Sequence, residues 1–210
     1  MNTKKLTSIA VLTAMAVIAG MFIRIRFMPG APFLTYDPKD VVIVIGGFMF
    51  GPLAAIYISF ATAFIEMVTV SDSGLIGMVM NFLASAFFAA PAAFIYKKMR
   101  NIWGAVLGLA AGIFFATSAM LLWNIFAVPL YTGLPREVVL GMILPIFLPF
   151  NLIKTGLNAS VAMLLYKPLS AALKAARLVN PGEKTKIQFG IMLVAALVAA
   201  GLIAVILIYL

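Results

Sequence analysis

Residues 148–165 read LPFNLIKTGLNASVAMLL, an apolar segment that carries the polar side chains Asn151, Lys154 and Asn158. A cation at membrane depth costs roughly 3 to 17 kcal/mol depending on the method, so Lys154 needs a partner, a wet cavity or a ligand. Spacings of three and four residues place the three polar side chains on one face of a helix. Pro149 bends that helix, and a broken helix with polar side chains is a recurrent binding-site device in membranes.

The composition is that of an all-α integral membrane protein. The 210 residues are 65% hydrophobic and 10% charged, whereas soluble domains are about 45–50% apolar and about 25% charged. Cysteine and histidine are absent, which excludes disulfides, cysteine metal sites and Ser-His or Cys-His catalysis. No GxxxxGK occurs, so the chain has no P-loop of its own. We expect no enzyme and no cofactor.

Apolar runs separated by loops predict seven membrane segments. Their expected bounds are 6–23, 41–49, 53–70, 75–96, 102–128, 138–166 and 187–210. The second segment rises only about 14 Å and cannot cross a bilayer, so we expect it to lie tilted or inside the protein. Pro145 and Pro149 should break the sixth segment.

The positions of Lys and Arg predict the orientation. With the N-terminus in the cytoplasm, ten of the 15 basic residues lie on the inner side, which agrees with the positive-inside rule. The net charge of +9 is therefore explained by topology, and we expect no nucleic-acid partner. The basic residues on the outer side would be Arg24, Arg26, Lys39 and Arg136. The first segment lacks a cleavage site and is expected to be a retained helix.

The chain divides into three parts in this interpretation. Residues 1–170 form a substrate-binding transmembrane bundle, 171–186 a basic cytoplasmic linker, and 187–210 an additional C-terminal transmembrane helix. We expect the last helix to pack through its small residues, which are Gly190, Ala195, Ala199 and Gly201.

Most of the remaining polar residues map to the outer half of the membrane, beneath a loop at 26–40 with the sequence RFMPGAPFLTYDPKD. The candidate ligand contacts are Leu34, Tyr36, Asp40, Glu66, Asn81, Asn124, Asn151 and Lys154. Amides, one cation and aromatic walls would suit a polar, partly aromatic small molecule. The loop, restrained by its prolines, would act as a lid at Phe33 to Tyr36. Three alternatives remain open: the asparagines only join helices, Lys154 extends to the membrane surface, or Lys154 forms a structural ion pair with Glu66.

The first segment has small residues on one face, among them Ala10 and Ala14. Small residues spaced in this way let another helix approach closely.

Four pieces of sequence carry a family resemblance. They are YDPKDV at 36–41, FGPLAA at 50–55, NFLASAFFAAPAAFIYKK at 81–98 and LPFNLIKTGL at 148–157. Together they resemble the substrate-binding S components of energy-coupling factor (ECF) vitamin transporters, most closely the riboflavin-specific branch. The resemblance covers roughly residues 6–170. S components usually end after a sixth helix, so the segment at 187–210 is a departure.

The resemblance implies a six-helix bundle that captures a vitamin from outside and docks on a transmembrane coupling subunit driven by two cytoplasmic ATPases. The flavin-contacting residues of riboflavin-type members fall on Asn124, Asn151 and Lys154, and the docking face falls on Ala10 and Ala14. The chain would thus be the high-affinity riboflavin-binding subunit of an ECF-type ABC importer in a prokaryotic cell membrane. Two alternatives are an S component for another vitamin or cofactor precursor, and a structural membrane protein without transport.

Overall fold

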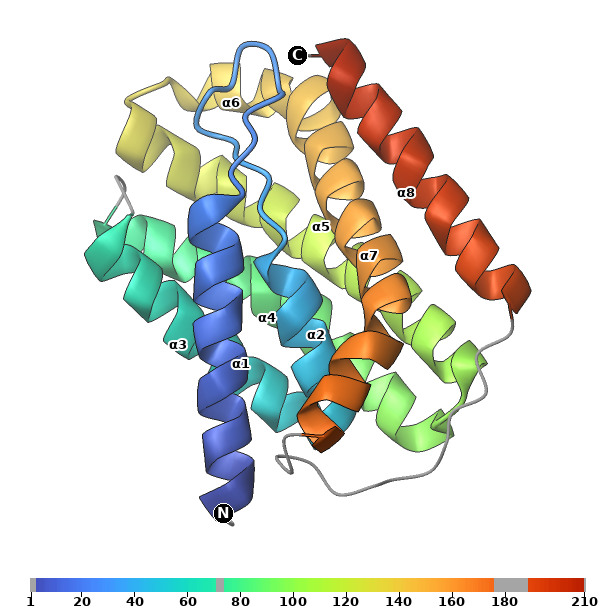
Figure 1. Cartoon of the computed structure of the whole chain (residues 1–210). Coiled ribbons are helices and arrows are strands. Elements are labelled where there is room, and N and C mark those ends of the chain that lie inside the picture. Colours follow the sequence, from blue (N-terminus) through green and yellow to red (C-terminus); the bar gives the residue numbers. More distant parts are fainter. Residues whose placement is uncertain (1–2, 71–73, 176–188, 210) are drawn as a thin grey trace.

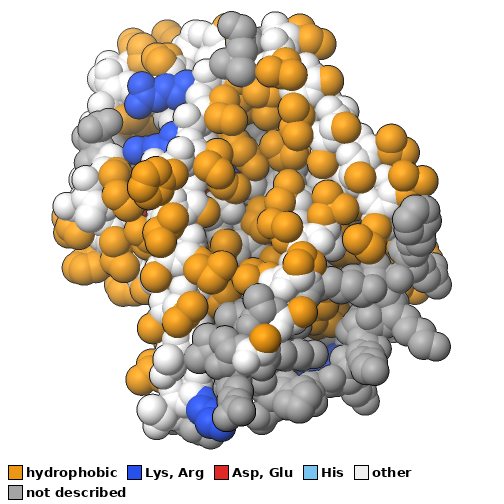
Figure 2. Space-filling view, in the orientation of Figure 1, with side chains coloured by type: hydrophobic (Ala, Val, Ile, Leu, Met, Phe, Trp, Pro, Cys, Tyr) orange, Lys and Arg blue, Asp and Glu red, His pale blue; other side chains and the backbone are white. Residues whose placement is uncertain are grey.

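The computed structural model describes residues 3–70, 74–175 and 189–209, and the regular elements within these ranges are helices (Figure 1). In chain order they are α1 (Thr3–Phe22), α2 (Lys39–Phe50), α3 (Pro52–Thr69), α4 (Gly74–Met99), α5 (Ile102–Thr132), α6 (Arg136–Met142), the π-helical turn η1 (Ile143–Phe147), α7 (Leu148–Ala175) and α8 (Phe189–Tyr209). Within these described ranges, six helical stretches are long and apolar enough to cross a membrane. Figure 2 shows a largely apolar face with basic side chains at its upper left and lower ends. The prediction of an all-α membrane protein is confirmed.

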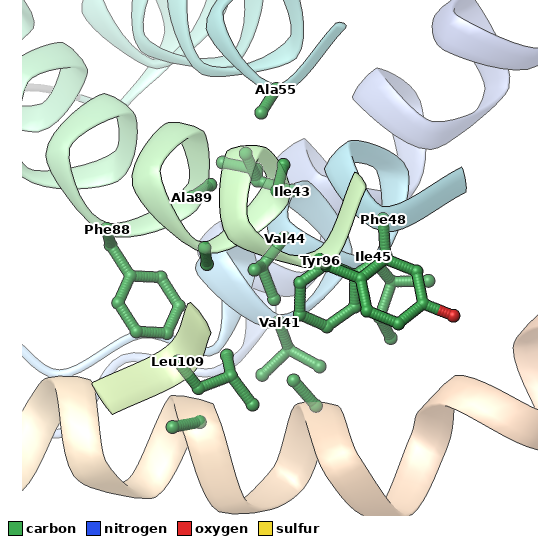
Figure 3. Packing of buried hydrophobic residues seen from close by; sticks show 14 of the residues in the cluster. Val41, Ile43, Val44, Ile45, Phe48, Ala55, Phe88, Ala89, Tyr96 and Leu109 are labelled. Carbon is green, nitrogen blue, oxygen red and sulfur yellow. The ribbon is translucent and has the colours of Figure 1, made fainter. Parts of the chain in front are cut away.

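The short helix α2 lies in the middle of the bundle and contacts α1, α3, α4 and α7. A helix that is apolar on all sides is stable only when it is surrounded, and most of α2 is buried. Its side chains Val41, Val44 and Phe48 pack among residues of neighbouring helices, including Leu109 (Figure 3). The predicted short helix is confirmed, and it begins at Lys39. Its N-terminal end therefore lies inside the molecule.

Glycine permits the close approach of α2 to its neighbours. A Cβ atom added at Gly47 would lie 2.9 Å from the Cβ of Ala93 and 3.0 Å from the Cβ of Ala55. These distances are below van der Waals contact, so a larger residue would push α2 away from α3 and α4.

The predicted break near Pro145 and Pro149 is also confirmed. Here α6, η1 and α7 follow one another without an intervening loop, and Pro145 lies within the π-helical turn. Proline lacks an N–H group and leaves a carbonyl of the preceding turn without its helical partner. The side-chain nitrogen of Asn151 donates to the Phe147 carbonyl at 2.7 Å. The broken region thus orients Asn151 at the start of α7.

The loop between α1 and α2 folds back over the bundle (Figure 1). Ile25 and Tyr36 pair through two backbone hydrogen bonds of 3.0 and 2.8 Å. The ring of Phe27 stacks on Phe150 of α7 with a centroid distance of 5.5 Å. These contacts hold the loop against the start of α7.

Helix α8 packs along α7 (Figure 1). Of the four small residues predicted to face the bundle, Ala195 and Ala199 are buried, but Gly190 and Gly201 are exposed. The glycine part of that prediction is wrong, because larger residues such as Ile206 make the contact instead. Helix α7 continues to Ala175, so the predicted linker at 171–186 begins as helix. Its remainder, from 176, and residues 187–188 lie outside the described residues.

Candidate ligand-binding site

A cavity of about 380 Å³ lies where α1 ends and α2 begins. Ligand pockets are typically about 300–1,000 Å³, so this one has room for a single small molecule. Seven of the eight predicted contacts line it: Leu34, Asp40, Glu66, Asn81, Asn124, Asn151 and Lys154. Chain segments from the loop to α7 thus bring the predicted side chains to one place.

Tyr36 is the exception, since it is not among the residues that line the cavity. Its side chain is buried in the apolar cluster that contains Phe27 and Leu34. Burial raises the pKa of the Tyr36 phenol, and the nearby carboxylates of Asp37 and Asp40 raise it further. A protonated, buried tyrosine at this position supports the fold of the loop.

Charged and polar side chains form a continuous network of ion pairs and hydrogen bonds along one side of the cavity. The Lys154 ammonium donates to Oδ2 of Asp37 at 2.8 Å and to the Thr35 carbonyl at 3.3 Å. The ammonium of Lys39 lies 3.7 Å from Oδ1 of Asp37 and 2.6 Å from Oε2 of Glu66. The side-chain nitrogen of Asn81 donates to that same Glu66 oxygen at 3.2 Å. This network therefore connects α7, the loop, α2, α3 and α4.

This pairing corrects one expectation from the sequence and adds to another. Glu66 pairs with Lys39, so the alternative in which Glu66 pairs with Lys154 is wrong. Lys39, which we expected on the outer side of the membrane, is 3% exposed and lines the cavity, so the finding adds its burial and leaves its side of the membrane a prediction. A signal was present in the sequence: Lys39 opens an apolar helix that is too short to span, and such a helix must place its first residues inside the protein.

Asp37 stays ionised between the two lysines. Burial alone raises the pKa of its carboxyl, but Lys154 and Lys39 lower that pKa by more, and the result lies below the ordinary value. Opposite charges within a few ångströms favour the charged form of a carboxyl in this way. Asp37 was not among the predicted contacts, although it precedes Lys39 by only two positions.

Asn158, which follows Asn151 and Lys154 on the same face of α7, contacts the backbone of the loop and the start of α2. Its side-chain nitrogen donates to the Asp37 carbonyl at 3.3 Å and to Oδ2 of Asp40 at 3.4 Å. The other carboxylate oxygen of Asp40 accepts a hydrogen bond from the Ser85 hydroxyl. Asp40 is thereby held at the cavity wall by two neutral donors.

Besides Oδ1 of Asp37, two buried polar groups in the cavity wall have no hydrogen-bond partner among the described residues. They are Oδ1 of Asn124, on a side chain that is 1% exposed, and the hydroxyl of Tyr131. The ring of Tyr131 contacts Phe33 of the loop edge-on, with centroids 5.7 Å apart. Most buried polar atoms in proteins are paired, so these two groups are ready to bind a ligand. Sequence analysis missed Tyr131, which lies near the end of an apolar span without a marking motif.

Arg24 and Arg26 also line the cavity, and Arg24 donates to the Val70 carbonyl at 3.3 Å. They follow α1 and are exposed. The cavity thus combines an inner chain of paired charges with basic side chains at its exposed edge.

The predicted docking residues lie elsewhere, on α1. Ala10 and Ala14 are both exposed, together with Ile18 on the same helix. Their role in docking remains a prediction.

The family model described as "ECF transporter, substrate-specific component" matches residues 4–166. The chain belongs to this family. As an ECF S component it is a multi-pass membrane transport protein and not an enzyme. The match ends before α8 begins.

Three bacterial relatives are similar over most of their length. The riboflavin transporter RibU of Staphylococcus aureus (strain TCH60) is 33% identical over 187 residues, covering 82% of this chain and 94% of the relative. The riboflavin transporter FmnP of Bacillus subtilis (strain 168) is 31% identical over 169 residues, covering 73% and 85%. RibU of Streptococcus thermophilus (strain ATCC BAA-250 / LMG 18311) is 31% identical over 183 residues, covering 82% and 85%.

A solved structure of the S component of a bacterial ECF transporter has the same fold. It superposes with a TM-score of 0.69 at 32% identity, covering 83% of this chain and 99% of that one. The bundle is therefore shared with a known S component.

Proposed function

We propose that this S component binds riboflavin from outside the cell and passes it to an ATP-driven import complex. The observation that carries the proposal is the meeting of Asn124, Asn151 and Lys154 at one cavity. These are the positions on which the flavin contacts of riboflavin-type members fall. The names of the three relatives support the same ligand.

The chemistry of the cavity suits a flavin. Riboflavin has a flat ring system with carbonyl oxygens and an N–H group at one edge, and a hydroxylated chain. The ammonium of Lys154 can donate to a ring carbonyl, and the amides of Asn124 and Asn151 can both donate and accept. Phe33 and Phe150 provide aromatic wall, against which a flat ring packs favourably.

The loop from Phe33 to Tyr36 acts as a lid in this proposal. Phe33 and Leu34 line the cavity, and the Thr35 carbonyl accepts from Lys154. A ligand below these residues would be covered by them and could leave only after the loop moves.

The partners follow from the family and from the sequence. A transmembrane coupling subunit docks against the α1 face around Ala10 and Ala14, which is exposed and small. Two cytoplasmic ATPases supply energy, because this chain carries no P-loop. With the N-terminus in the cytoplasm, the cavity at the opposite end of α1 opens to the outside.

Titration of the detergent-purified protein with riboflavin, followed by flavin fluorescence, tests the ligand. We expect one bound flavin per chain and about five- to 150-fold weaker binding in Asn151→Ala and Lys154→Met, since each loses a polar ligand contact worth about 1–3 kcal/mol. Gly201→Ala, at an exposed position on α8 with open space around it, is the matched control and should bind as the parent does. Folded protein that binds no flavin would contradict the proposal.

A further inference from the structure

The position of the Lys154 ammonium is set by the loop as well as by α7. An ammonium group has three N–H donors. Two of them have acceptors in the loop, Oδ2 of Asp37 at 2.8 Å and the Thr35 carbonyl at 3.3 Å. One donor therefore remains for a ligand in the cavity, and its direction depends on where the two loop acceptors lie.

Asp37 is itself held from three sides. Its side chain lies between Lys154 and Lys39, with Nζ···Oδ distances of 2.8 and 3.7 Å. Its backbone carbonyl accepts from Asn158 at 3.3 Å. Lys39 is in turn fixed by Glu66 at 2.6 Å. The carboxylate thus cannot move without breaking other buried interactions.

Immobilising Lys154 in advance has an energetic consequence. A free lysine side chain has large rotamer entropy, roughly 2 kcal/mol, which a ligand would otherwise have to remove on binding. A group that is already held in its bound direction contributes more to affinity than a mobile one. The residue that fixes Lys154 would then affect affinity through Lys154, although Asp37 also lines the cavity.

We propose that Asp37 is a positioning residue, which orients the Lys154 ammonium toward the bound ligand and ties the loop above the cavity to α7. The inference rests on the proposed flavin binding and goes beyond it, since it assigns to Asp37 a role that is exerted through Lys154. Because Asp37 and Thr35 belong to the loop, the Lys154 ammonium would contact both the ligand and the loop that covers it. Loss of Asp37 should therefore weaken binding and also speed release.

A purely structural role for Asp37 makes a different prediction. If its carboxylate only neutralised buried lysines, Asp37→Asn would lower the unfolding midpoint of the ligand-free protein, but the protein that remains folded would bind and release flavin as the parent does. A double-mutant cycle in riboflavin affinity, measured on folded protein, then tests whether the effect of Asp37 on binding passes through Lys154.

The experiment measures riboflavin affinity and dissociation rate for the parent, Asp37→Asn, Lys154→Met and the double variant. We expect Asp37→Asn to weaken binding by about tenfold or more in the parent, and by less than about threefold in the Lys154→Met background. The control cycle pairs Asp37→Asn with Asn124→Ala, on α5. Those two losses should multiply, because no hydrogen bond or ion pair links Asn124 to Asp37 or Lys154 in the described residues.

Equal losses in both Lys154 backgrounds would overturn the proposal, and so would an unchanged affinity in Asp37→Asn. If Asp37→Asn does not fold, Asp37→Glu takes its place: it keeps the charge but moves it by one methylene, and its loss must also shrink in the Lys154→Met background. Failure of the parent to bind flavin would instead refute the proposed ligand, so the two failures are distinguishable.

Discussion

Replacing Asn124 with leucine should stabilise the ligand-free protein while weakening ligand binding. The Asn124 side chain is 1% exposed, and its Oδ1 has no hydrogen-bond partner among the described residues. Leucine has the same branched shape and number of side-chain heavy atoms, and it has no polar atom to leave unpaired. The same substitution removes from the cavity wall a group that is available to a ligand.

The magnitude follows from the cost of an unpaired polar atom. An unsatisfied buried donor or acceptor costs about 1–3 kcal/mol, so the free energy of unfolding should rise by about that amount. For a chain of this size each kcal/mol corresponds to roughly 2–4 °C in the unfolding midpoint. The ligand loses a hydrogen bond and keeps an unpaired group, which weakens binding by about 1–3 kcal/mol, or about five- to 150-fold.

Thr117→Val provides the matched control on the same helix. The Thr117 hydroxyl is also buried and unpartnered, but Thr117 does not line the cavity. Its replacement should raise the midpoint and leave flavin affinity unchanged. Thermal unfolding in detergent, with and without riboflavin, measures both quantities. A lower midpoint in Asn124→Leu without ligand, or an unchanged affinity, would refute the reasoning.

Three further predictions concern the loop, α1 and α2. Shortening the loop at Phe33–Tyr36 should speed flavin dissociation in a stopped-flow measurement, and an unchanged rate would exclude the lid. Ala14→Trp should abolish uptake while riboflavin titration of the purified chain stays normal, because Ala14 is exposed; lost binding would place Ala14 in the bundle core instead. Gly47→Val should destabilise the protein by about 1–3 kcal/mol, since a Cβ there would lie 2.9 Å from that of Ala93. Gly201→Ala, with open space around it, should leave the midpoint of thermal unfolding unchanged.

The local features of the chain could be predicted because each depends on neighbouring residues. Apolar runs mark the spans, and the proline pair at 145 and 149 marks the broken helix. The length of the apolar run after Lys39 marks α2 as too short to cross. The one-face arrangement of Asn151 and Lys154 follows from helical periodicity alone, and both line the cavity.

The partners of the buried charges could not be predicted, because they depend on packing between distant segments. Lys154 contacts Asp37 across 117 positions, and Lys39 contacts Glu66 across 27. Coulomb attraction favours the pairing of either lysine with any nearby carboxylate. The sequence therefore allowed Glu66 as a partner of Lys154, because it does not give the distances between these groups. The backbone pairing of Ile25 with Tyr36 fixes the end of the loop. The Tyr36 side chain then lies in the apolar cluster with Phe27 and Leu34, and Asp37 lies between the two lysines.

The sequence by itself thus determined a helical membrane protein, its broken helix and the polar residues that a buried site requires, because solvation in lipid and helical periodicity act locally. Only the tertiary structure decided which charges pair, that Lys39 lies inside, and that Tyr36 supports the loop instead of lining the cavity. Those outcomes depend on how the loop and α2 fit between α1, α3 and α7, and the close packing that fixes this fit joins residues from every part of the bundle.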